Sequence, residues 1–131
     1  MTPVETIKDV VTATYPAFQV FTDSIPEEYI DNYATTQVLI RESQSNIDGL
    51  GDMTFNLIQY GADIQIFYGT DLTEDMLLIE IKLMKALEQA GWVISYSQPH
   101  YLDLSNTDVQ QTVKIITITK EITLEELGYN A

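Results

Sequence analysis

The chain has 131 residues, a length that suits one domain with its own hydrophobic core. Hydrophobic residues make up 45% of it, which argues against a disordered chain in spite of a net charge of −14, and the absence of cysteine excludes disulfides, thiolate metal sites and cysteine nucleophiles. With 20 acidic residues against 6 basic ones, the surface would repel nucleic-acid phosphate, so no specific nucleic-acid binding is expected and a protein with a positive patch is the better partner.

The composition also gives no reason to expect a membrane anchor. No apolar run reaches the ~18 residues that a membrane-spanning helix needs, and the first residues lack the basic and then apolar segments of a signal peptide. We therefore expect a soluble protein that is made in the cytoplasm.

An amino-terminal helix is predicted over residues 3–14. Thr2 can cap it, Pro3 suits the first helical position, and Glu5 can return a hydrogen bond to the cap, as in a capping box. Pro16 disfavours helical geometry at the residue before it and so ends the helix.

The next part of the chain alternates short strands with polar segments. Residues 18–21 and 35–41 are aromatic, aliphatic and β-branched and predict strands, with a turn or short helix over residues 27–34 between them. Residues 42–52 are crowded with serine, asparagine, aspartate and glycine and predict a loop. Residues 53–60 fit either a further strand or a continuation of that loop.

The most regular part of the sequence is a strand followed at once by a helix. Apolar and polar residues alternate over residues 62–68, which is the period of a strand with one buried face. Asp71, with Glu74 three positions later, predicts the start of a helix over residues 72–90. Gly91 can end this helix by taking the left-handed conformation.

The rest of the chain predicts two more strands and a tail. Residues 92–97 and 111–120 form an antiparallel hairpin with a long polar connection. The acidic and apolar residues 121–131 are predicted to be a flexible tail that docks on a neighbour. The order of elements indicates a single α+β domain, with a mostly antiparallel sheet of four to five strands packed against the two helices.

The predicted long helix has two apolar faces. Leu77, Ile81 and Met84 form a ridge that is turned by roughly 100° or more from the main apolar stripe. This ridge either packs beneath another element of the same chain or forms a subunit contact, since a monomer seldom leaves such a ridge in water. The main stripe, assigned to the core, consists of Met76, Ile79, Leu83, Ala86, Leu87 and Ala90.

Patterns that indicate catalysis or ligand binding are few. His100 is the only histidine, and without cysteine it cannot complete a structural zinc site. Residues 48–52 lack the ligand spacing of an EF-hand, and their glycines lack the rest of a dinucleotide fingerprint. Asp103 and Asp108 could pair as acid and base, but the same residues equally well cap turns. We therefore expect no enzymatic activity, no cofactor and no metal.

Several segments together resemble a known family. They are the strand at residues 63–68, the helix end at residues 85–92, the Ile25-Pro26 pair, the strand at residues 38–40, and His100 followed by Asp103, Thr107, Gln110 and Thr112. In order and spacing they resemble the tail terminator, or tail completion, proteins of siphophages and prophages of Gram-positive hosts. The resemblance spans most of the chain.

This resemblance implies a structural protein of the virion tail, assembled in the host cytoplasm. Similar terminators form a homo-oligomeric ring, a hexamer, that binds the last ring of the major tail (tube) protein, stops tail growth and presents a surface to the head–tail connector protein. In that setting Leu77, Ile81 and Met84 are the predicted subunit interface. The predicted docking loops, residues 42–52 and 99–108, contain Asn46, Asp48, Asp52, His100 and Asp103.

Two other interpretations remain open. An acidic module that mimics DNA, or that binds another protein, would explain the net charge directly, although the carboxylates are scattered rather than regularly spaced on one face. A different head–tail joining component with a similar α+β fold would have another partner. Oligomeric state separates a mimic from a terminator, because mimics are usually monomers or dimers whereas ring subunits must be able to close a ring.

Overall fold

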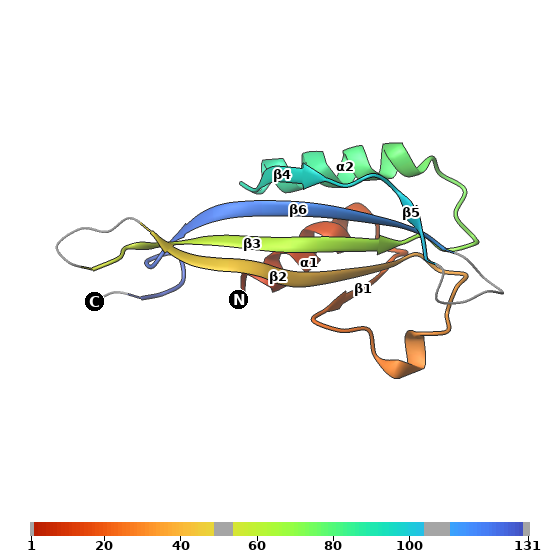
Figure 1. Cartoon of the computed structure of the whole chain (residues 1–131), viewed down its shortest axis with the longest axis horizontal. Helices are drawn as coiled ribbons and strands as arrows, with labels where there is room; N and C mark the ends of the chain where they lie inside the picture. The colour runs from red at the N-terminus through yellow and green to blue at the C-terminus, as the bar shows by residue number, and fades with distance from the viewer. Residues whose placement is uncertain (1, 49–53, 104–110, 130–131) are drawn as a thin grey trace.

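The computed structural model describes residues 2–48, 54–103 and 111–129. Over these residues the chain forms an α+β fold with two α-helices and a mixed, mostly antiparallel sheet of six strands (Figure 1). This confirms the predicted fold class. The elements in chain order are α1 (Pro3–Thr14), β1 (Gln19–Thr22), the 3-10 helix η1 (Glu27–Tyr29), β2 (Gln37–Asp48), β3 (Leu57–Phe67), α2 (Met76–Gln89), β4 (Val93–Ser97), β5 (Tyr101–Leu102) and β6 (Thr112–Thr123).

The strand order explains which parts of the chain lie at the edges of the sheet. It runs β1-β2-β3-β6-β4, with the two-residue strand β5 pairing with the start of β6. The β1–β2 pair is parallel and the other pairs are antiparallel. The sheet has more strands than the four to five predicted, because the short β5 adds to the five-stranded path. Strands β1 and β4 therefore mark opposite edges.

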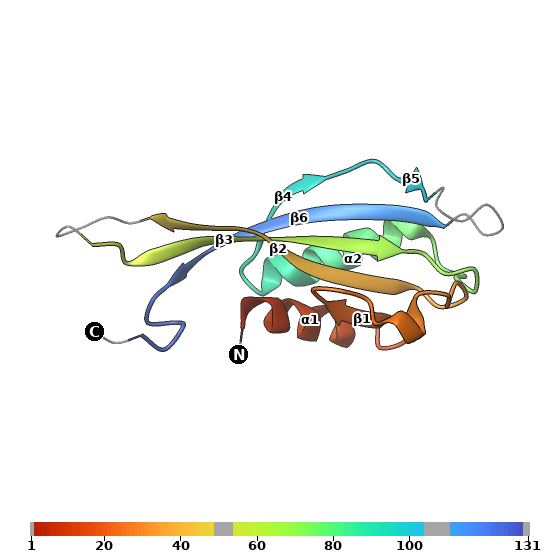
Figure 2. The same ribbon diagram turned by 60° about the horizontal axis from the view of Figure 1, so that its bottom comes forward.

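Both helices pack on one face of the sheet, and the core lies between the two layers (Figure 2). Side chains two residues apart on a strand share a face, so the strands place alternate aliphatic residues against the helices. From the helices, Ile7 and Val11 of α1 and Ile79, Leu83 and Leu87 of α2 meet them. The sheet side of the core includes Val38, Ile40, Ile64, Ile66, Ile116 and Ile118.

Helix α1 has the boundaries and the cap that the sequence predicts. The Glu5 N–H donates to Thr2 Oγ1 at 3.2 Å, and the Thr2 N–H donates to Glu5 Oε2 at 3.4 Å. These two bonds are the reciprocal pair of a capping box. All residues that make this cap are adjacent in sequence, and therefore the sequence alone could predict it.

Helix α2 begins later than the predicted residue 72. Asp75, not Asp71, is its N-cap, and Asp75 Oδ1 accepts from the Leu77 N–H at 2.8 Å. The Asp71 N–H instead donates to the Ala34 carbonyl oxygen at 3.0 Å. Asp71 is therefore hydrogen-bonded to a segment that is distant in sequence and does not begin the helix. At the other end Gly91 has a φ of 96°, and the Trp92 N–H donates to the Leu87 carbonyl oxygen at 3.0 Å, which confirms the predicted glycine cap.

A long hairpin of β2 and β3 replaces most of the loop predicted at residues 42–52. The ladder continues from Gln37 opposite Phe67 to Asp48 opposite Leu57, with an irregularity between Glu42 and Gln44. Gly61 lies inside β3 beside this irregularity, opposite Gln44. The hairpin projects beyond both helices at the left of Figures 1 and 2. The prediction of a loop was wrong because this part of the hairpin extends beyond the core. Neither face of the strand is buried there, so its sequence lacks the alternating aliphatic residues that indicate a strand.

The last strand is also longer than predicted. Strand β6 continues to Thr123, so the first three residues of the segment predicted as a tail belong to the sheet. The Leu124 N–H then donates to the Asn56 carbonyl oxygen at 3.2 Å, which ties the end of β6 to the start of β3. In the part of the chain that the structure describes, no helix is long and apolar enough to cross a membrane.

Candidate functional site

The outer face of α2 presents apolar side chains to solvent. Leu77, Leu78 and Ile81 are 59%, 44% and 43% exposed, while the opposite side of the same helix is fixed in the core. We call these three residues the α2 patch. Met84, predicted to belong to the same ridge, is partly buried and packs against the core instead. The interface role predicted for Leu77, Ile81 and Met84 stays a prediction, and Met84 is the least available of the three.

Two lysines border the α2 patch. Lys82 forms an ion pair with Glu74 at 2.8 Å, and Lys85 forms one with Glu88 at 3.2 Å. The hydrogen bond from Lys82 is the main reason why the pKa of Glu74 is lowered from its usual range. Exposed pairs of this kind contribute little to stability, so both lysines could change partners at low cost.

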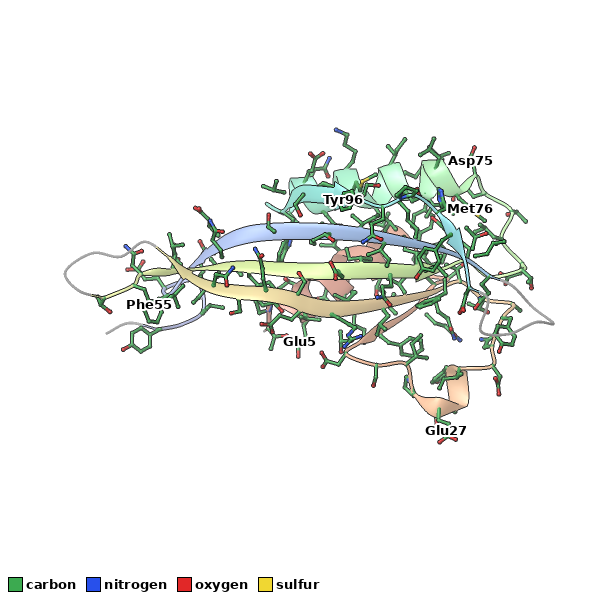
Figure 3. The ribbon with its side chains drawn as sticks, viewed as in Figure 1. Glu5, Glu27, Phe55, Asp75, Met76 and Tyr96 are labelled. Carbon is green, nitrogen blue, oxygen red and sulfur yellow. The ribbon has the colours of Figure 1, made fainter. Side chains whose placement is uncertain are left out.

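A second exposed surface lies beyond the other edge of the sheet, around η1. Glu27, Glu28 and Asp31 are exposed there together with Ile30, whose side chain is 53% exposed. We call these four residues the η1 surface. Figure 3 shows the Glu27 side chain pointing away from the sheet.

Buried polar groups hold the η1 surface in place. The amide of Gln37, which is only 3% exposed, donates to the Tyr29 carbonyl oxygen at 2.8 Å and to Gln19 Oε1 at 3.0 Å. The ring of Tyr29 also packs on Phe21, with the centroids 5.1 Å apart. A surface held in this way loses little conformational entropy when it binds a partner.

Beneath the α2 patch, a buried carboxylate gathers polar groups from several elements. The Glu80 side chain is 1% exposed, and its Oε2 accepts from the Tyr68 hydroxyl at 2.5 Å and lies 2.6 Å from His100 Nε2. Its Oε1 lies 3.8 Å from Lys114 Nζ. A buried carboxylate is tolerated only when it is paired, so these three groups make the position possible. We call the four residues the Glu80 cluster.

The Glu80 cluster anchors the chain between β4 and β5. His100 belongs to that connection, and Lys114 Nζ also donates to the carbonyl oxygen of Gln98. The Gln98 N–H donates to the Ile115 carbonyl oxygen at 3.0 Å. The cluster therefore holds the residues just before β5 in position, and the Tyr101 and Leu102 side chains of β5 are both exposed.

The sequence predicted part of this site and missed its centre. His100 was predicted as a docking residue, and the structure pairs it with the buried Glu80 carboxylate while 37% of its side chain stays exposed. Glu80 was not singled out, although it stands four residues after Met76 and three before Leu83, the spacing of the buried stripe. A carboxylate at core spacing is unusual and is the signal that could have revealed the cluster.

Two of the other predicted docking residues, Asn46 and Asp48, lie at the opposite end of the sheet from His100. Asn46 is exposed on β2 and Asp48 is the last residue of that strand, at the far end of the hairpin. Asp103 follows β5, and its N–H donates to the Gln111 carbonyl oxygen at 2.8 Å. Asp52 lies outside the described residues, as does Asp108. Among the described residues, no group of three or more histidine, aspartate or glutamate side chains is placed to hold a metal ion.

Alkaline pH should weaken the fold through Tyr68. Burial, and next the hydrogen bond to the Glu80 carboxylate, raise the pKa of Tyr68 far above its usual value of 10. A group whose pKa is raised by folding stabilises the folded state at low pH, and it loses that effect above the unfolded pKa. We therefore expect the free energy of unfolding to fall by about 1.4 kcal/mol for each pH unit above pH ~10 through this tyrosine alone.

Thermal melting of the wild-type protein and of Tyr68→Phe between pH 8 and about 12 measures this contribution. The variant should be less stable at neutral pH, because it leaves the Glu80 carboxylate without the hydroxyl, and its stability should fall less steeply in base. Parallel pH profiles of the two proteins would show that Tyr68 does not titrate in this way.

The fold and its surfaces place the protein in a class of small acidic α+β domains. Both helices lie on one face of a mixed sheet, and apolar side chains are exposed at both edges of that sheet. Residues 1–123 match the model of a family described as "Protein of unknown function (DUF806)", and the chain belongs to that family. A search of curated proteins finds no match.

Proposed function

We propose that this protein is a siphophage tail terminator, a subunit of a ring that caps the tail tube and forms part of the head–tail joint. The α2 patch is the observation that carries the proposal. Three large aliphatic side chains that are 43% or more exposed on a helix otherwise fixed in the core are a surface that a partner would cover. Each of these side chains is already about half buried, so covering its remaining exposed surface would contribute roughly half of the ~1.5–3 kcal/mol that complete burial gives, and a second subunit gains by covering all three.

The shape and charge of the molecule agree with this role. The β2–β3 hairpin reaches beyond both helices, and its exposed Ile47 and Asn46 are available for contact with the tube protein or the connector. A net charge of −14 per subunit would also keep DNA that passes through a ring from adhering to its wall. The resemblance of the sequence to tail terminators supplies the identity of the partners.

Inactivating the gene in the phage or prophage that encodes this protein tests the proposal. A terminator stops tail growth and presents a surface to the head, so its loss should give tails of excessive length and heads without tails in electron micrographs. A plasmid copy of the wild-type gene should restore normal virions and serves as the control. Normal virions in the absence of the gene would contradict the proposal.

A further inference from the structure

Charge limits how copies of this protein can meet. Each copy has a net charge of −14, so contact between two identical acidic surfaces is strongly disfavoured. A contact between copies must place cations of one subunit against carboxylates of the next. The six lysine and arginine residues of the chain all lie in the described residues, and they differ in how exposed they are.

Only the outer side of α2 presents two exposed cations close together. Lys114 is buried in the Glu80 cluster, and Lys120 lies over the Trp92 ring at 5.7 Å from its centroid. Lys8 and Arg41 are exposed but come from different elements, α1 and β2. Lys82 and Lys85 instead lie three residues apart on α2, so two lysines, each paired with a glutamate of its own chain, border the α2 patch.

The η1 surface is complementary to this patch. It has an exposed aliphatic side chain, Ile30, among Glu27, Glu28 and Asp31, and no lysine or arginine lies within residues 9–40. An apolar contact with a rim of opposite charges is the usual arrangement of a specific protein interface. The apolar side chains would supply affinity, and the charges would select the partner surface and its orientation.

The two surfaces lie on opposite sides of the subunit. Helix α2 leads into β4 at one edge of the sheet, whereas η1 follows β1 at the other edge, and Figure 1 shows them at the top and the bottom of the molecule. They therefore cannot contact each other within one chain. Pairing between copies is therefore head-to-tail. A contact of this kind repeats from subunit to subunit, and it gives a closed ring where the rotation between neighbours closes and an open filament where it does not.

We infer that neighbouring subunits join through the α2 patch of one copy and the η1 surface of the next, with Lys82 and Lys85 facing Glu27, Glu28 and Asp31. This inference rests on the proposed ring and specifies its contact. Because the Lys82–Glu74 and Lys85–Glu88 pairs are exposed, exchanging them for contacts with the next subunit costs little.

Zero-length carbodiimide cross-linking of the wild-type protein at millimolar subunit concentration tests the contact. The reagent joins a lysine amine to a carboxylate that touches it, and mass spectrometry of the dimeric band identifies the pair. We expect Lys82 or Lys85 to be linked to Glu27, Glu28 or Asp31. Links from Lys82 to Glu74 and from Lys85 to Glu88 within one chain are the internal control. A dimeric band linked only elsewhere, or the absence of any dimeric band, would overturn the inference.

Charge reversal then gives a second readout. The Lys82→Glu, Lys85→Glu variant and the Glu27→Lys, Glu28→Lys variant should each self-associate roughly 100-fold more weakly than the wild type, since each places like charges in contact. The chain with all four substitutions restores opposite charges and the original net charge, so its association should recover. A Lys8→Glu, Arg41→Glu variant changes the net charge as much as the first variant does and should associate more strongly than that variant.

These experiments distinguish an error in the inferred contact from an error in the proposed ring. Light scattering that finds closed rings for the wild type and for every charge variant would reject the contact and leave the proposed ring intact. Failure of the four-substitution chain to recover, while each double variant is monomeric, would also reject the pairing of these two surfaces. Normal tails in the absence of the gene would instead reject the proposed function itself.

Discussion

Replacing Glu80 with alanine is expected to lower the free energy of unfolding by about 3–5 kcal/mol. Without the carboxylate, Lys114 keeps a buried ammonium with no counter-ion, and the Tyr68 hydroxyl loses the oxygen that accepts its hydrogen bond at 2.5 Å. His100 also loses its anchor, so the connection between β4 and β5 should loosen.

Urea denaturation of Glu80→Ala beside Glu88→Ala measures this effect. Glu88 lies on the same helix but is exposed and pairs with exposed Lys85, so its removal should cost less than about 1 kcal/mol. A Glu80→Leu, Lys114→Met double variant removes both charges and should be more stable than Glu80→Ala. A loss for Glu80→Ala as small as the loss for Glu88→Ala would mean that the cluster does not hold the fold.

Replacing Gly69 with alanine is expected to destabilise the protein by about 3 kcal/mol, at the upper end of the cost of overpacking. An added Cβ would lie 2.2 Å from the Ala34 carbonyl oxygen and 2.5 Å from the carbonyl carbon of Thr35. These are backbone atoms, and the same segment accepts the Asp71 N–H at 3.0 Å. The clash can therefore be relieved only by separating the two segments.

Gly61→Ala is the matched control for this effect. An added Cβ there would meet Gln44 Cγ at 2.6 Å, but that atom belongs to a flexible side chain that can move away. Thermal melting should therefore show a clearly smaller loss for Gly61→Ala than for Gly69→Ala. Equal losses would show that the close contact of Gly69 with the backbone of Ala34 and Thr35 does not constrain the fold.

The sequence predicted best those features that depend on neighbouring residues. The start of α1 follows from Thr2, Pro3 and Glu5, and its end follows from Pro16. The end of α2 follows from Gly91, whose positive φ favours glycine. The predicted start of α2 was wrong because the Asp71 N–H donates a hydrogen bond to the Ala34 carbonyl oxygen, and these two residues are distant in sequence. No local pattern distinguishes Asp71 from Asp75 as a cap.

The candidate site also has features that local sequence predicts and features that it does not. Exposure of Leu77 and Ile81 could be predicted from helical spacing, because both fall off the core stripe. The Glu80 cluster could not be assembled from sequence, since His100 and Lys114 reach the carboxylate from the β4–β5 connection and from β6. The position of the η1 surface could not be predicted either, because it depends on the strand order, which puts β1 at the edge opposite β4.

Adding the purified protein to a lysate of phage that lacks its gene tests the central claim most directly. The measurement is the number of heads joined to tails in electron micrographs, before and after addition. Wild-type protein should restore joined particles. A folded Leu77→Glu, Ile81→Glu variant, whose α2 patch carries charges that a neighbouring subunit cannot bury, should not. Heads and tails that remain separate with the wild-type protein, or that join without it, would contradict a role as tail terminator.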